Sequence, residues 1–103
     1  MDSIANNVSA HEEAVLINKE EIGNLIFPKD DVLLTKEEKN ERIKRLDRAM
    51  HLGSNKIKVK IVFSDIEGKK VVDTSIWGLT EHNIILKGTT IIPIRCIHEI
   101  KFF

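Results

Sequence analysis

The feature that most constrains the fold is a change in the spacing of apolar residues near Lys56. Between Thr35 and His51 apolar residues recur at helical spacing, and from Lys56 onward they alternate with polar residues. A period of about 3.6 residues is typical of an amphipathic helix, and a period of 2 is typical of a strand with one buried face. The sequence therefore predicts one helix followed by a series of strands.

The helix is predicted to begin at a capping box formed by Thr35 and Glu38. In such a box the Thr hydroxyl accepts the backbone N–H of the Glu, whose carboxylate accepts the backbone N–H of the Thr. No Gly or Pro follows until Gly53, which is expected to end the helix. The apolar stripe expected to face the strands consists of Ile43, Leu46, Ala49 and Met50.

The first two strands are predicted to form a hairpin. A two-residue loop between Asp65 and Gly68 sets Ile61 opposite Val72, whereas a shift of one residue would mix the polar and apolar faces. The same register places Val59 opposite Thr74, Lys60 opposite Asp73, Ile57 opposite Ile76 and Lys56 opposite Trp77 as a cation–π pair. Further strands are predicted over 83–87, 90–94 and 98–102.

These elements predict an α+β fold, in which one capped N-terminal helix precedes about five short antiparallel strands forming a small, partly open barrel. Residues 35–103 are expected to form this single helix-plus-barrel domain. Residues 1–34 carry seven acidic and two basic residues. We expect them to form an acidic N-terminal extension that is a marginal helix over 12–27 or partly disordered. Because residues 35–60 carry nine basic and four acidic residues, the two segments either neutralise each other or leave a basic surface.

Several classes of protein are disfavoured by the composition. A chain of 103 residues is about one domain, and its single cysteine excludes an intramolecular disulfide. No apolar run approaches the roughly 20 residues that span a bilayer, and the N-terminus lacks the basic segment of a secretory signal. We therefore expect a cytoplasmic protein without membrane association.

The stretch Ile85-Leu86-Lys87-Gly88-Thr89-Thr90-Ile91 resembles the second motif of Sm proteins. In that motif two apolar strand residues precede a basic residue and Gly, and an apolar residue follows three positions later. The order of a helix, strands, and a short turn before the last strand is also similar to Sm-like and SH3-like barrels, including the Rof type of Rho-inhibiting protein. In the Sm family the basic residue and Gly help line an RNA-binding pocket, which implies that role for Lys87 and Gly88.

Cys96 and His98 are the residues most suggestive of chemistry, because they lie two positions apart. A zinc site needs three or four ligands, and the other histidines show no ligand spacing. A cysteine nucleophile needs an oriented base and an oxyanion site, and no motif supplies them. We therefore predict a buried structural cysteine, no catalytic residue, no metal and no cofactor.

The function favoured by the sequence is a non-catalytic binding or regulatory module that contacts another protein or itself. Trp is enriched among interface hot spots, and the hairpin after Trp77 is apolar on both faces, so either the helix or another chain should cover it. The predicted partner-binding residues are Trp77, Ile84, Ile85, Ile91 and Ile92.

The alternative is an Sm-like protein that binds RNA or DNA through a basic face of the helix and strands. Lysine and arginine contacts to phosphate would make such binding salt-dependent. This hypothesis ranks second because the chain has no Tyr and Phe63 is expected in the core, which leaves few aromatic side chains for base stacking. Its predicted residues are Lys44, Arg45, Arg48, Lys58, Lys87 and Gly88.

Overall fold

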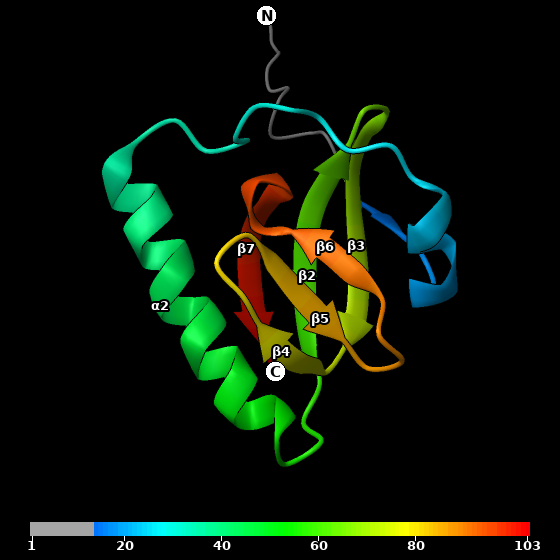
Figure 1. Ribbon diagram of the computed structural model, residues 1–103, viewed down its shortest axis with the longest axis vertical. Helices are drawn as coiled ribbons and strands as arrows, with labels where there is room; N and C mark the ends of the chain where they lie inside the picture. The colour runs from blue at the N-terminus through cyan, green and yellow to red at the C-terminus, as the bar shows by residue number, and fades with distance from the viewer. Residues whose placement is uncertain (1–13) are drawn as a thin grey trace, which may run out of the picture.

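The computed structural model describes residues 14–103, which contain one α-helix and seven strands in two sheets (Figure 1). One sheet has the strand order β1-β3-β2-β7, and the other has the order β4-β5-β6. The strands are β1 (Val15–Leu16), β2 (Val59–Asp65), β3 (Gly68–Thr74), β4 (Ile76–Leu79), β5 (Asn83–Leu86), β6 (Ile91–Pro93) and β7 (Ile97–Phe102). The predicted α+β class is confirmed. Within the described residues all strand pairs except β1–β3 are antiparallel, and the sheets do not close into one barrel.

The helix α2 (Lys36–Gly53) begins at the predicted capping box. The Thr35 hydroxyl accepts the Glu38 N–H at 3.1 Å, and the Glu38 carboxylate accepts the Thr35 N–H at 3.3 Å. Leu46 and Ala49 are buried as predicted, but the placement of Ile43 in the core is wrong, because 57% of it is exposed. Arg42 takes the inward position, one turn before Leu46, since a carboxylate is available there to balance its charge.

The β2–β3 hairpin has the predicted register, with Asp65 opposite Gly68, Ile61 opposite Val72 and Val59 opposite Thr74. The pairing ends there, so the predicted pairs Ile57–Ile76 and Lys56–Trp77 are wrong. The chain turns at Ser75 and enters β4 in the second sheet. The Ser75 hydroxyl donates to the Ile57 carbonyl at 3.2 Å, which holds the two segments together without a ladder.

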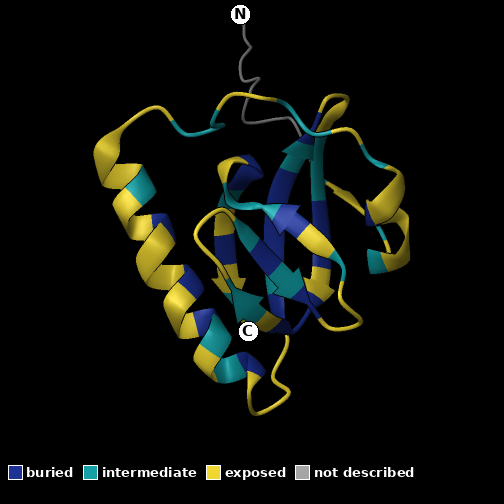
Figure 2. Cartoon of the chain, viewed as in Figure 1, coloured by how far each residue is buried: buried dark blue, intermediate teal, exposed yellow. Residues whose placement is uncertain are grey.

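The core lies between the two sheets and α2 (Figure 2). In β5 and β6 the side chains of Ile84, Leu86 and Ile92 are fully buried, whereas Ile85 is half-buried and Ile91 is 50% exposed. Because successive residues of a strand point to opposite faces, only one face of this hairpin packs against the core. The expectation that both faces are covered is therefore wrong for this chain by itself.

Residues 14–34 wrap along the first sheet and contribute to the core. Ile22 is buried in the 3-10 helix η1 (Lys19–Asn24), which takes the place of the marginal α-helix predicted over 12–27. Backbone hydrogen bonds join Ile17 to Val71 and Ile26 to Ile66. The part of the predicted extension before residue 14 lies outside the described residues. No helix within residues 14–103 is long and apolar enough to cross a membrane.

Candidate functional site

The candidate site is centred on Trp77, whose side chain is directed outward by a β-bulge. The pairs Ile76–Leu86 and Gly78–Ile85 flank it, so β4 has one more residue than β5 at this point. Bulges of this kind change the direction of a side chain. Trp77 is 54% exposed although Ile76 beside it is fully buried. The local backbone thus presents a large aromatic surface to solvent.

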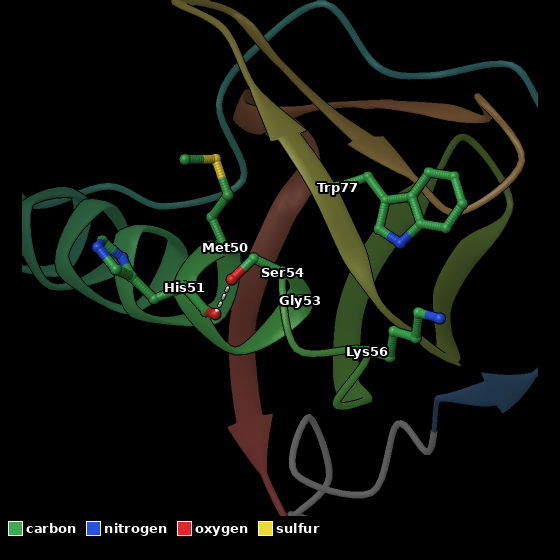
Figure 3. Close-up of a pocket in the computed structure, with 6 residues that line it drawn as sticks. All are labelled: Met50, His51, Gly53, Ser54, Lys56 and Trp77. Atoms are coloured by element: carbon green, nitrogen blue, oxygen red, sulfur yellow. Dashed lines mark hydrogen bonds between the residues drawn. The ribbon is translucent and has the colours of Figure 1, made fainter.

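A first hollow of about 490 Å³ lies between Trp77 and the C-terminal end of α2 (Figure 3). Figure 3 shows Trp77 and Lys56 on the side of the hollow opposite His51 and Met50. The close approach of α2 to β4 forms the base, because a Cβ on Gly53 would overlap the Ile76 carbonyl group. The hollow is lined by Met50, His51, Gly53, Ser54, Lys56 and Trp77.

A second hollow of about 290 Å³ shares Lys56 and Trp77 with the first. It is formed where the loop after α2, the corner between β3 and β4, and the turn after β5 meet. Lys56 has a positive φ of 64°, a backbone conformation uncommon for residues other than Gly, Asn and Asp. The residues that line this hollow are Lys56, Lys58, Thr74, Ser75, Trp77 and Lys87.

The charge around the second hollow is mainly positive, although Glu20 and Asp73 line another hollow together with Lys58 and Lys87. Lys56, Lys58 and Lys87 form no ion pair with any residue in 14–103, and all three are exposed. Among the lysines of the strands, Lys60 lies 3.9 Å from Asp73 and Lys70 lies 3.0 Å from Asp65, whereas Lys69 and Lys101 also form no ion pair within residues 14–103. The three lysines therefore concentrate positive potential around one exposed aromatic ring.

The residues predicted for nucleic-acid binding fall into two separate groups. Lys58 and Lys87 line the second hollow, and Gly88 follows in the turn with a φ of 86°. The other group is on α2, where Lys44 is exposed. There Arg45 pairs with Glu41 at 3.1 Å, and the Arg48 guanidinium lies 4.4 Å from the centre of the Phe102 ring. The predicted basic face is thus not one continuous surface.

The residues predicted for partner binding are divided by burial. Ile84 and Ile92 belong to the core, which leaves Trp77, Ile85 and Ile91 at the surface. Ile85 pairs with both Gly78 and Ile91 across the sheet. Its side chain covers Gly78, since a Cβ there would lie 3.1 Å from the Ile85 Cδ1 atom. A short apolar row therefore runs outward from the strand that carries Trp77.

Cys96 and His98 do not form a joint site. Cys96 is fully buried in the 3-10 helix η2 (Ile94–Cys96), where its thiol faces the Pro28 carbonyl at 3.8 Å. Burial raises the pKa of this thiol above its ordinary value, which opposes nucleophilic reactivity. The His98 Nε2 atom lies 2.7 Å from the Ser64 hydroxyl in β2. No group of three His, Cys, Asp or Glu side chains suited to a metal ion occurs within residues 14–103.

The residues that sequence reasoning missed are those of α2 and the loop after it: Met50, His51, Gly53 and Ser54. Their role depends on the docking of the helix end against β4, and a helical pattern carries no signal of what lies beyond its last turn. Lys56 and Trp77 were expected to meet as a cation–π pair. They share both hollows, but the cation–π contacts found in residues 14–103 are Arg48 with Phe102 and Lys60 with Phe103.

Neither a family model nor a curated protein nor a solved structure matches the chain.

Proposed function

We propose that the chain is a non-catalytic binding module that contacts another protein through Trp77. The observation that carries this proposal is a tryptophan, 54% exposed, between two hollows whose walls come from three separate segments of the chain. Burial of an aromatic side chain is a large favourable term in many interfaces, and Trp is enriched among residues that dominate binding energy. The apolar row of Ile85 and Ile91 extends the surface available to a partner.

The position of Trp77 has no evident role in folding. The inward-facing neighbours on β4 and β5, Ile76 and Leu86, fill the core without it. Exposed apolar side chains are common when isolated, but here the ring borders two concave surfaces. A side chain that contributes little to the core and borders concave surfaces is well placed to insert into, or receive, part of a partner.

We further propose that the domain is related to Sm-like and SH3-like barrels. Support comes from the order of the elements. The β2–β3 hairpin is followed by a corner at Ser75, the β4-β5-β6 meander and a 3-10 turn. The last strand, β7, then returns to pair with β2.

A second candidate function is nucleic-acid binding, favoured by the meeting of Lys58 and Lys87 with Trp77 in one hollow. Stacking of bases on aromatic side chains within a positively charged groove is the usual means of binding single strands. This candidate ranks below protein binding because Arg45 and Arg48 are engaged elsewhere on α2. Without them, Lys58 and Lys87 are the predicted basic residues that remain beside Trp77.

Selection from a random peptide library displayed on phage tests the proposed function. We expect peptides to be enriched on the wild-type protein and lost on Trp77→Ala, which should remain folded because Trp77 is about half exposed and lies outside the core cluster. Leu34→Ala is the matched control, since Leu34 is an exposed apolar residue that lines neither hollow. Light scattering on the same proteins shows whether a second copy of the chain is the partner. Failure to enrich any Trp77-dependent peptide, with a monomeric wild type, would refute the proposal.

A further inference from the structure

We propose that the partner segment is acidic and inserts one apolar side chain beside Trp77, while its carboxylates contact Lys56, Lys58 and Lys87. This inference rests on the proposed function and specifies the partner's chemistry. The apolar side chain would occupy the hollow between Met50 and Trp77. The carboxylates would lie along the adjoining hollow, which the three lysines surround.

The first line of support is the distribution of charge. Lys56 and Lys58 lie in the loop between α2 and β2 and Lys87 lies in the turn after β5, yet all three meet around one hollow. None forms an ion pair within residues 14–103. Opposite potentials on the two partners guide their association and disfavour wrong partners. An acidic segment is the protein partner that complements such a surface.

The second line of support is the backbone of Lys56. Its φ of 64° is in the left-handed region, which Gly and Asn adopt more readily than Lys. Here that conformation ends α2, because the Lys56 N–H donates to the Gly53 carbonyl at 2.9 Å and the Ile57 N–H donates to the Leu52 carbonyl at 3.1 Å. The helix end therefore fixes the position of Lys56. The Lys56 side chain lies between the two hollows, where it can contact a ligand in either.

The third line of support is the first hollow itself. Its volume of about 490 Å³ falls in the range of roughly 300–1,000 Å³ that is typical of ligand pockets. Met50 and Trp77 supply apolar walls, and the close contact between Gly53 and β4 gives the hollow a backbone floor. A partner's apolar side chain would contact Met50 and Trp77 in this hollow, while the lysines lie around the adjoining one.

The partner is expected to bind through side chains and not as an added strand. The nearby strand edges are already covered by α2: the end of the helix packs on the Ile76 carbonyl of β4. Arg42 and Arg45 donate hydrogen bonds to the Ile97 and Ile100 carbonyls of β7, at 2.9 and 3.3 Å. Strand addition requires accessible backbone groups along an edge. The Ile97 and Ile100 carbonyls are already bonded, and the Ile76 carbonyl is covered by Gly53.

Fluorescence titration tests the inference directly, because Trp77 is the only tryptophan of the chain. The probes are an 11-residue peptide of Glu and Asp with one central Phe, the same peptide with Ser for Phe, a version with Lys for every acid, and oligouridylate. We expect the acidic Phe peptide to bind at least about tenfold more tightly than the other three, with an affinity that falls as salt rises.

Variants of the three lysines locate the binding. Lys56→Asn, Lys58→Gln and Lys87→Gln should each weaken the acidic peptide by about two- to fivefold, the range of exposed ion pairs. Lys56→Asn should also leave the protein at least as stable, because Asn tolerates the left-handed conformation. Lys44→Gln, which removes an exposed lysine of α2 outside both hollows, is the control and should change nothing.

The outcomes separate this inference from the proposed function. If phage selection yields Trp77-dependent peptides that are not acidic, the protein-binding function stands and the acidic partner is refuted. If oligouridylate saturates the Trp77 signal and the acidic peptide does not, nucleic-acid binding replaces both. If the acidic peptide binds equally well to the three lysine variants, the lysines are not its contact residues and the inference fails.

Discussion

The least expected residue of the structure is Arg42, a charged side chain that is almost completely buried on the inner face of α2. It forms two hydrogen bonds with the Asp31 carboxylate, at 2.9 and 2.7 Å, and a third with the Ile97 carbonyl. Its Nε atom is buried without a hydrogen-bond partner among residues 14–103. A buried charge is tolerated when it is paired, and removal of one partner is costly because the other stays behind. The Asp31–Arg42 ion pair therefore connects the segment before α2 to the helix and, through Arg42, to β7.

Because the Asp31 carboxyl is protonated at low pH, the Asp31–Arg42 ion pair should be weakened by acid. Burial of the Asp31 carboxyl acts to raise its pKa, but hydrogen bonds from Arg42 and from the Leu33 N–H outweigh burial and lower the pKa below its usual value. A carboxyl whose pKa is lower in the folded state stabilises the fold above its unfolded pKa of about 3.9. This contribution is lost as the pH falls through the folded pKa.

We predict that Asp31→Asn lowers the free energy of unfolding at pH 7 by about 1–3 kcal/mol, because Arg42 stays buried with a weaker partner. The difference from wild type should shrink in acid below the folded pKa of Asp31, where the wild-type carboxyl is also neutral. Urea unfolding at neutral and acidic pH measures both. Asp30→Asn, at an exposed neighbouring carboxylate, serves as the control. An equal difference at the two pH values would show that the charge of Asp31 is not the cause.

The docking of α2 depends on the absence of a side chain at its last residue. A Cβ on Gly53 would overlap the Ile76 carbonyl oxygen and lie 2.9 Å from its carbon. The glycine predicted as a helix stop therefore has a second role, because it lets the end of α2 contact β4 directly. The same contact forms the floor of the first hollow, so the helix position also shapes the candidate site.

We predict that Gly53→Ala destabilises the protein by about 1–3 kcal/mol, the usual cost of forcing extra atoms into a packed region. It should also shift the emission of Trp77, which lines the hollow at this contact. Gly23→Ala is the matched control, because no atom of residues 14–103 lies within 4 Å of the added Cβ and the φ of Gly23 is not positive. It should be neutral or stabilising by up to about 1 kcal/mol. If both variants unfold at the same denaturant concentration as wild type, the close contact is not a constraint.

Over the whole molecule, the described part of the N-terminal segment belongs to the same core as the helix and sheets. Ile22 is 1% exposed and packs in the main cluster, and Phe27 packs against the fully buried Phe63 with ring centres 6.3 Å apart. The backbone of this segment also bonds to β3 and to the β2–β3 turn. Its acidic residues contribute one ion pair with α2, that of Asp31, so packing and backbone bonding hold the segment in place more than charge does.

We predict that Ile22→Ala lowers the free energy of unfolding by about 2–5 kcal/mol, the range for large-to-small changes in a core. Ile26→Ala, four residues on and 64% exposed, should change it by no more than about 0.5 kcal/mol. Chemical denaturation of the two variants provides the measurement. A small effect of Ile22→Ala would mean that residues 14–34 can detach without disturbing the sheets.

Much of the fold could be predicted because it depends on residues close in sequence. The capping box of Thr35 and Glu38 spans three residues, and the register of the β2–β3 hairpin follows from a two-residue loop and the alternation around it. Less of the candidate site could be predicted. Trp77 was predicted as a contact residue from its type and setting, whereas its place in a bulge follows from pairing with β5.

Local pattern alone thus supplied the helix, its cap, the hairpin and the α+β class, since each is set by interactions over a few residues. Three features are seen only in the folded chain. The chain leaves the β2–β3 hairpin at Ser75 and enters β4, Arg42 points inward, and the lysines at 56, 58 and 87 lie around Trp77. These features depend on contacts between distant segments, such as that between Arg42 and Ile97. A periodic pattern shows which face of an element is apolar, but it does not show which other element will cover that face.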